Sequence, residues 1–286
     1  MVDIKNGTAV ITGGGSGIGR SLAFALAKAS PTKDRRITRI VVADMRSEPA
    51  EQVVRELLDL GVQAKAVACD ISDEAEVRSL AHETEAAFGQ VDLLFNVAGV
   101  TLLGKLHETS AKDIEWLFSV NVFGVCHMVR FFMPLLKRAA TAGAAHIVNV
   151  SSGFGLAMPS MGPVQPSAYA GTKHALVGLS DAMRKELEAD RIGVSVVCPG
   201  VVNTNAWNSM SFRQERFGGP REGSVASKER IEKWGQNPDE TAQLILSGIS
   251  RGDFFILPLS GEGQKSMRAE IEARYTELRG VLDRDH

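Results

Sequence analysis

Short apolar segments alternate with longer amphipathic segments along most of the chain. Most of the short segments are continuously apolar and rich in β-branched residues, which is typical of strands buried on both faces of a parallel sheet. The longer segments carry apolar residues at helical spacing. Parallel neighbours need crossover connections, and helices of this length supply them. The pattern therefore predicts an α/β fold, one doubly wound parallel sheet of about seven strands with helices on both faces.

These elements can be placed along the sequence. Strands are expected at residues 8–12, 39–43, 64–69, 92–96, 146–150, 194–198 and 254–257. Helices are expected at 18–29, 49–60, 74–88, 114–138 and 169–189, with a further helical pattern at 262–283. A chain of 286 residues can bury one substantial core, so residues 1–286 are expected to form a single domain, with 259–286 as a C-terminal tail.

Three stretches interrupt this regular alternation. Residues 31–36 form a polar, basic loop, and residues 152–167 are rich in Gly, Pro and Met. Residues 203–237 are polar, with Gly218, Gly219 and Pro220 at their centre. The last two stretches follow strand ends, where open α/β sheets bind ligands. We therefore expect 203–237 to be a substrate loop, acting as a lid that orders on binding.

Charge and cysteine usage narrow the class of protein. A net charge of −2 provides no strong field to attract nucleic acid or an anionic membrane, so neither partner is expected. Cys69, Cys126 and Cys198 are far apart in apolar runs, which argues against disulfides or a metal site and fits a reducing compartment. We find no signal-peptide core and no uninterrupted apolar stretch long enough to span a bilayer. The expectation is a soluble, cytoplasmic protein.

A glycine-rich turn lies between the first expected strand and the first expected helix. Its glycines, from Gly13 to Gly19, would let backbone N–H groups approach a pyrophosphate at the helix N-terminus. Such a turn is weak evidence alone, and its place between strand and helix strengthens it. Asp44 ends the second strand, where a carboxylate accepts hydrogen bonds from ribose hydroxyls and repels a 2′-phosphate, although it could also be a solvated loop acid. This favours NAD over NADP, and Arg46 partly offsets the preference.

Tyr169 and Lys173 are four residues apart at the start of a helix and so share one face. A phenol with a pKa near ~10 is a poor base at neutral pH, and a nearby ammonium lowers that pKa. The pair alone could also be an ordinary exposed helix face. Ser151 and Ser152 end a strand just upstream, where a hydroxyl could bind a substrate oxygen beside the phenol.

Together these residues resemble the short-chain dehydrogenase/reductase family. The resemblance runs in order from residue 8 to about 204 and rests on Thr12, Gly13, Gly17, Gly19, Asn96-Val97-Ala98-Gly99, Asn121, Ser152, Tyr169, Lys173, Pro199 and Gly200. It implies a Rossmann-type fold and an NAD(P)-dependent oxidoreductase acting on CH–OH groups. Val97 departs from the family, which often has a second asparagine there. The 152–169 segment is also a few residues longer than usual and contains Pro159, Pro163 and Pro166.

The resemblance assigns a role to each matching residue. Tyr169 would be the general acid/base, and Lys173 would lower its pKa and hold the nicotinamide ribose. Ser152, preferred over Ser151, would orient the substrate oxygen, and Asn121 would anchor a water linking Lys173 to solvent. Asp70 would meet the adenine ring, and Thr204 the nicotinamide carboxamide. The expected cofactor set is Gly13, Ser16, Gly17, Ile18, Gly19, Asp44, Asp70, Ile71, Asn96, Ala98, Gly99, Tyr169, Lys173, Pro199, Gly200, Val202 and Thr204.

Apolar side chains follow the catalytic serine and the Pro-Gly turn. They could line a pocket for a bulky hydrophobic, aromatic or cyclic alcohol, or simply pack the loops down: Phe154, Leu156, Met158, Met161, Trp207, Met210 and Phe212. Arg213, Arg216 and Arg221 could contact a carboxylate or be solvated. The apolar helix 114–138 and small residues near 170 could pack between subunits, and the resemblance implies a homodimer or homotetramer.

The expected activity is the reversible NAD-dependent oxidation of a secondary alcohol to a ketone. An NADP-dependent carbonyl reductase is the near alternative. A non-catalytic dinucleotide-binding regulator is the alternative from another class. Such a regulator would be expected to lack at least one of Asn121, Ser152, Tyr169 and Lys173, and all four are present.

Overall fold

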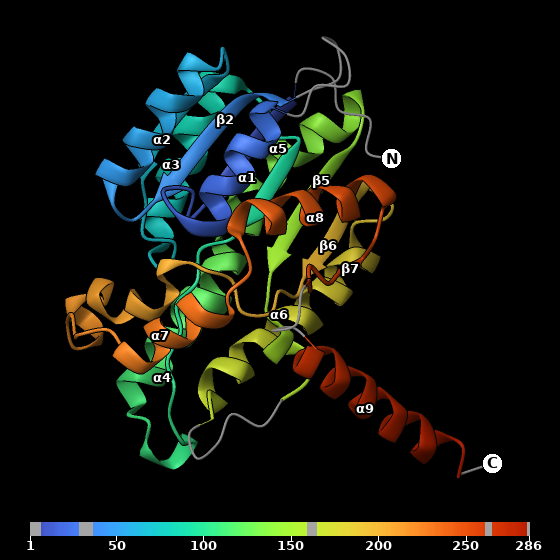
Figure 1. Cartoon of the computed structure of the whole chain (residues 1–286). Helices are drawn as coiled ribbons and strands as arrows, with labels where there is room; N and C mark the ends of the chain where they lie inside the picture. Colours follow the sequence, from blue (N-terminus) through green and yellow to red (C-terminus); the bar gives the residue numbers. More distant parts are fainter. Residues whose placement is uncertain (1–6, 29–36, 159–164, 261–264, 285–286) are drawn as a thin grey trace.

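A seven-stranded parallel sheet forms the centre of the molecule (Figure 1), in a computed structural model that describes residues 7–28, 37–158, 165–260 and 265–284. The strand order is β3-β2-β1-β4-β5-β6-β7, and every pairing is parallel. The strands are β1 Gly7–Thr12, β2 Ile37–Asp44, β3 Gln63–Ala68, β4 Leu93–Asn96, β5 Ala145–Val150, β6 Ile192–Val197 and β7 Phe255–Ile256. The order reverses between β1 and β4, and in such sheets ligands bind in the crevice beyond those two strand ends. The doubly wound α/β prediction is confirmed.

Helices cover both faces of the sheet because successive strand residues point to opposite sides. Val10 packs into the core on one face with α3, α4, α5 and α6, whereas Ala9 and Ile11 pack on the other with α1, α2 and α8. The helices are α1 Gly17–Lys28, α2 Ser47–Asp59, α3 Glu74–Phe88, α4 Ala111–Phe118, α5 Gly124–Ala142, α6 Ser167–Glu186, α7 Val225–Trp234, α8 Pro238–Arg251 and α9 Lys265–Leu282.

The expected helix at 114–138 is divided in the structure. A π-helical segment, Ser119–Phe123, joins α4 to α5 and places Asn121 at its centre. The whole run Ala111–Ala142 is long and apolar enough to cross a membrane by length and composition, although no stretch of that length was expected from the sequence. Half of its most apolar window is buried inside the fold, as in the core helix of a soluble domain, so the run is weak evidence for a membrane span.

The region after β6 differs most from the sequence-based expectation. Residues expected to form an irregular substrate loop contain the 3₁₀ helices Asn205–Phe212 and Glu215–Phe217, followed by α7. Helix α8 was not predicted either. The C-terminal helix α9 was predicted, and it projects away from the body of the molecule (Figure 1). The expectations for 31–36 and for Pro159, Met161 and Pro163 lie outside the described residues.

Candidate active site

The glycine-rich turn after β1 is shaped as a close-packed cradle. Gly13 and Gly17 have φ values of 63° and 50°, which side-chain-bearing residues rarely adopt. A Cβ on Gly19 would lie 2.3 Å from the carbonyl oxygen of Gly13, so the first turn of α1 could not approach the loop if this residue were larger. The turn therefore leaves backbone N–H groups and a helix N-terminus open to an anion, as a pyrophosphate requires.

Thr12 ties this turn to the end of β4. Its hydroxyl oxygen accepts hydrogen bonds from the backbone N–H groups of Val97 and Ala98 at 3.0 and 3.1 Å, and its hydroxyl lies 3.3 Å from the carbonyl oxygen of Phe95. The backbone at Val97 is thus held in place although the asparagine often found in the family is missing. Asn96 points away from the cavity and donates to Asn149 Oδ1 at 2.8 Å. Its role here is to join β4 to β5.

Asp44 lies at the end of β2, beside the glycine turn. Its carboxylate accepts hydrogen bonds from the backbone N–H groups of Gly15 and Arg46, each at 3.1 Å. The Arg46 guanidinium lies 3.6 Å from the same carboxylate and 4.4 Å from the centre of the Phe212 ring. Asp44 is therefore buried and held in place, and it faces the cavity rather than being a solvated loop acid.

Ser152, Tyr169 and Lys173 meet at the end of β5. The Lys173 ammonium lies 5.7 Å from the centre of the Tyr169 ring and donates to the carbonyl oxygen of Val150 at 3.0 Å. The hydroxyl of Ser152 lies close enough to the phenol of Tyr169 to act on its pKa by hydrogen bonding. Ser151 instead donates to the backbone carbonyl of Lys173 at 2.8 Å, so its hydroxyl joins the end of β5 to α6.

Burial shifts the pKa of both titratable groups. Desolvation raises the pKa of Tyr169 to about 12, and the hydrogen bond from Ser152 acts in the opposite direction. Desolvation also lowers the pKa of Lys173 to about 8, because the buried ammonium loses its hydration. Near neutral pH Lys173 thus remains mostly protonated, and its proton is easier to release than that of an exposed lysine. Such opposed shifts in one pocket are typical of functional sites.

Asn121 lies behind this group and does not line the cavity. Its side-chain amide is fully engaged: Oδ1 accepts from the Val100 N–H at 2.9 Å, and Nδ2 donates to the Val100 carbonyl and to Thr172. A Cβ on Gly99 would lie 3.2 Å from Asn121 Oδ1 and 3.3 Å from Lys173 Nζ, so a side chain at this position would crowd both groups. The π-helical turn around Asn121 is a feature that is frequent at functional sites.

One cavity of about 570 Å³ contains most of the sequence-predicted residues. Only Asn96 and Asn121 of the predicted site do not line it. The lining includes Gly13, Ser16, Gly17, Ile18, Gly19, Asp44, Asp70, Ile71, Ala98, Gly99, Ser152, Tyr169, Lys173, Pro199, Gly200, Val202 and Thr204. Among the described residues, no group of three or more His, Cys, Asp or Glu side chains could hold a metal ion. The fold thus brings together most of the residues that the sequence motifs predicted.

The other end of this cavity is lined by apolar side chains. Phe154, Trp207 and Met210 line it, as expected for a substrate pocket. Phe212 also lines the cavity, but it lies beside Arg46 at the cofactor end, and Leu156 is buried in a separate small core cluster. The segment after β6 is attached to the body through Ser209, whose hydroxyl contacts both the N–H and the carbonyl of Thr101 at 3.1 Å. The buried ion pair between Arg213 and Asp113 attaches the same segment to α4.

The sequence left two groups near this wall unresolved. Arg213 is fully buried and forms an ion pair with Asp113 at 2.9 Å, so it contacts a carboxylate of the protein itself. Met267, the only buried residue among those of α9, packs against Gly153 and lines the cavity beside Ser152. The apolar spacing of α9 identified Met267 as one face of a helix, but nothing in the sequence indicated which strand end it would reach.

The cavity fits a nicotinamide dinucleotide. The glycine turn, where a side chain would fill the cradle, suits the pyrophosphate, and the buried Asp44 suits a ribose. Tyr169 and Lys173 lie at the far end, where the reactive ring would need a proton donor or acceptor. The parallel sheet, its switch point and this cavity define a dinucleotide-binding oxidoreductase.

Comparison with known proteins identifies the family. The short chain dehydrogenase family model matches residues 7–215. C alpha-dehydrogenase of a Sphingobium species is 34% identical over 263 residues, which are 90% of this chain and 82% of that protein. A short-chain dehydrogenase/reductase from Burkholderia phymatum in complex with NAD has a TM-score of 0.82 and 31% identity, covering 98% of this chain and 96% of that one. The apo form of LigD from Sphingobium has a TM-score of 0.74 and 29% identity, covering 98% of both chains.

The chain belongs to the short-chain dehydrogenase/reductase family. It is therefore an oxidoreductase that acts on CH–OH groups with a nicotinamide dinucleotide. The match to the family model ends at residue 215, so α7, α8 and α9 lie beyond it.

Proposed function

We propose that this enzyme interconverts a hydrophobic secondary alcohol, aromatic or cyclic, and its ketone with NAD. The observation that carries the proposal is the meeting of Ser152, Tyr169 and Lys173 at one end of the cavity that contains the glycine turn. The aromatic and methionine side chains around them supply an apolar surface for a bulky substrate. The relative named C alpha-dehydrogenase and the relative solved with NAD support the same reaction class.

In the alcohol-oxidising direction, Ser152 would orient the substrate hydroxyl and Tyr169 would take its proton. The bound nicotinamide would supply the hydride acceptor. Burial opposes the phenolate of Tyr169, and the nearby cationic ammonium of Lys173 stabilises it. Lys173 would also hold the nicotinamide ribose. Because the side-chain amide of Asn121 is already bonded to Val100 and Thr172, the backbone of the π-helical turn around it would hold the water that carries the proton onward from Lys173. In ketone reduction, Tyr169 would donate the proton instead.

The decisive experiment compares the native enzyme with Tyr169→Phe on a panel of hydrophobic secondary alcohols, using NAD and NADP. Loss of the phenolic hydroxyl removes the acid/base group, so kcat should fall by about 100- to 10,000-fold. The dissociation constant for NAD, measured by fluorescence, should stay within about twofold because no charge is removed. Equal turnover by the two proteins would contradict the role of Tyr169. Tight NAD binding without any turnover would favour the non-catalytic regulator.

The NADP-dependent carbonyl reductase is the second candidate, and Arg46 is the observation that favours it. Its guanidinium lies beside the buried Asp44 and lines the same cavity, where it could pair with a 2′-phosphate. Asp44 is the more buried of the two and is fixed by two backbone N–H groups. A fixed carboxylate at this point repels the 2′-phosphate, so we retain NAD as the cofactor.

We also propose a cytoplasmic homodimer or homotetramer. Exposed apolar groups on the α4–α5 run, such as Phe123 with 54% of its surface exposed, would be covered in an assembly. The free thiols of Cys69, Cys126 and Cys198 suit a reducing compartment. Light scattering at micromolar concentration should give a mass of at least two chains, and a monomer mass would contradict the assembly.

A further inference from the structure

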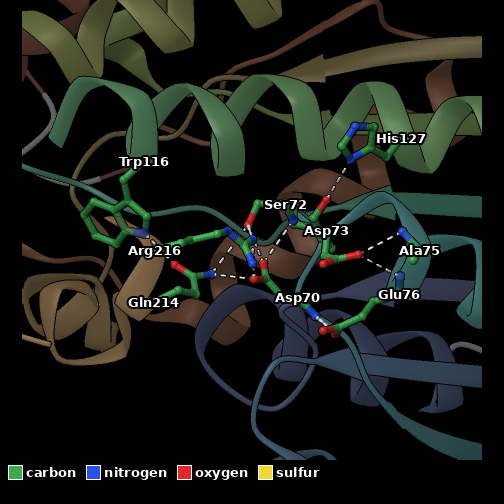
Figure 2. Close-up of polar contacts among 10 residues, drawn as sticks. Asp70, Ser72, Asp73, Ala75, Glu76, Trp116, His127, Gln214 and Arg216 are labelled. Atoms are coloured by element: carbon green, nitrogen blue, oxygen red, sulfur yellow. Dashed lines mark hydrogen bonds and ion pairs between the residues drawn. The ribbon is translucent and has the colours of Figure 1, made fainter. Parts of the chain in front are cut away.

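The carboxylate of Asp70, in the loop after β3, already has its full set of hydrogen-bond donors (Figure 2). Oδ1 accepts from the N–H and the hydroxyl of Ser72 at 3.0 and 2.6 Å. Oδ2 accepts from Gln214 Nε2 at 2.7 Å and from Arg216 Nη2 at 2.9 Å. An ionised carboxylate offers about four lone-pair positions, and these four donors occupy them. An adenine amine that bonded to Asp70 would have to displace one.

Two of those donors come from the segment that follows β6. Gln214 and Arg216 lie in the segment 205–217, which also carries the cavity-lining Trp207, Met210 and Phe212. More than 140 residues separate them from Asp70 in sequence. The contact therefore joins the loop after β3, which carries Asp70, to the segment 205–217, which we call the substrate wall.

Gln214 connects Asp70 to the core of the molecule. Its Oε1 accepts from the indole N–H of Trp116 at 3.0 Å, while its Nε2 donates to Asp70 (Figure 2). Trp116 is completely buried, and Asp70 has only 13% of its side chain exposed. The amide of Gln214 satisfies both neighbours, because the indole N–H of Trp116 requires an acceptor and the carboxylate of Asp70 requires a donor. Arg216 adds a second bond from the solvent side, where it also donates to Ser72 Oγ at 2.7 Å.

We propose that Asp70 anchors the substrate wall through Gln214 and Arg216, and that it does not recognise the amine of adenine. Gln214 and Arg216 are positioning residues that set the affinity for substrate from the cofactor side of the cavity. The inference rests on the proposed function for its NAD and alcohol ligands, and it revises the adenine role expected for Asp70. Hydrogen bonds to a partly buried carboxylate are strong enough for their loss to change binding by about tenfold.

The first test is binding of NAD and of nicotinamide hypoxanthine dinucleotide, in which a carbonyl oxygen replaces the adenine amine. An amine bonded to Asp70 would be replaced by an oxygen facing a carboxylate, and affinity would fall by about tenfold or more. If Asp70 is the anchor of the wall, calorimetry should give dissociation constants within about threefold of each other. A hypoxanthine dinucleotide that binds tenfold more weakly would overturn the proposal. This measurement needs no turnover, so it stays informative if the proposed activity fails.

The second test uses Gln214→Glu and Arg216→Gln. Gln214→Glu retains an acceptor for Trp116 and places a carboxylate against Asp70, and Arg216→Gln removes the cation. Both should raise substrate KM about tenfold, leave kcat and the NAD dissociation constant within about twofold, and accelerate protease cleavage within 203–224. Arg216→Lys should recover part of the KM. The matched control is Arg78→Gln, which removes an exposed arginine that pairs with Glu74 at 3.1 Å outside the cavity. Unchanged KM and cleavage in both variants would overturn the proposal.

Discussion

The two ends of the cavity are built in different ways. The cofactor end consists mainly of backbone at the ends of β1, β2 and β4, which neighbour one another in the sheet and are joined by hydrogen bonds of Thr12 and Asp44. The substrate end consists of side chains from segments that lie far apart in sequence and meet only through tertiary contacts. Substitutions at the cofactor end should therefore weaken NAD binding severely, and a second substitution should not restore it. Substitutions at the substrate end should change substrate KM moderately, and a second substitution should be able to restore it.

Among substitutions that compare the two ends of the cavity, the largest effect is expected from Gly19→Ala. The new Cβ would lie 2.3 Å from the Gly13 carbonyl oxygen and 3.0 Å from Gly14 Cα, so backbone must move apart. Overpacking of this kind costs about 1–3 kcal/mol, and here it separates the turn from the helix N-terminus, so NAD binding should weaken by up to about 100-fold. Calorimetric titration with NAD measures the dissociation constant. Gly178→Ala is the control, because nothing lies within 4 Å of its Cβ and its affinity for NAD should match the native value.

The next effect concerns the choice between NAD and NADP. Asp44→Asn keeps an acceptor for the backbone N–H of Gly15 and removes the negative charge, so the ratio of kcat/KM for NAD over NADP should fall about tenfold. Arg46→Gln removes the neighbouring cation and should raise the same ratio. The two variants thus serve as controls for each other. If the ratio changed in the same direction in both variants, neither the Asp44 nor the Arg46 charge would determine the discrimination at the ribose 2′ position.

A smaller effect, confined to the substrate end, is expected from Gly153→Ala. Its Cβ would lie 2.5 Å from Met267 Sδ and 2.7 Å from Cγ, which displaces a flexible side chain rather than backbone. Substrate KM should change by about three- to tenfold with the NAD dissociation constant unaffected. Because the clash is with Met267, the double variant Gly153→Ala/Met267→Ala should have nearly the KM of Met267→Ala alone. Additive effects in this double-mutant cycle would contradict the contact.

The same division explains how much the sequence could predict. The continuous apolar runs located all seven strands to within a few residues, and the glycine turn, Asp44, Tyr169 and Lys173 were found because each depends on local pattern or fixed spacing. The π-helical turn around Asn121 was not predicted, because apolar periodicity cannot distinguish it from a continuous helix. Local pattern specified the cofactor end almost completely.

At the substrate end the determinants are tertiary. Arg213 was left open between a carboxylate contact and solvent, and only the folded chain brings it to Asp113. Gln214 had no signal of any kind, since an isolated glutamine in a polar segment does not indicate that Trp116 and Asp70 lie on either side of it. Met267 belonged to an evident helical pattern, but its contact with Gly153 depends on how the chain returns after β7.

The weakest effect on activity, and a clear effect on stability, is expected at the opposite end of β5. His146 is buried there, and its Nε2 lies 2.8 Å from Ser195 Oγ, which itself donates to the Asp253 carbonyl. Ser195 Oγ must then accept from His146 Nε2–H. Desolvation lowers the pKa of His146 to about 4, below its ordinary value of 6.5. Between these two values the unfolded chain binds a proton that the folded chain does not, so stability is lost as pH falls from 6.5 towards 4.

The variant that isolates this contribution is His146→Gln, whose amide can still donate to Ser195. It should lose less stability on acidification than the native protein, by up to about 3 kcal/mol between pH 6.5 and 4, as measured by urea unfolding. Its activity at pH 7 should be unchanged, because the site lies at the other end of the strand. His107→Gln is the control: that ring is 77% exposed, so its pH dependence should follow the native protein. If the stability of His146→Gln kept the native pH dependence, the loss of stability in acid would have to arise from other groups, and His146 would not contribute to it.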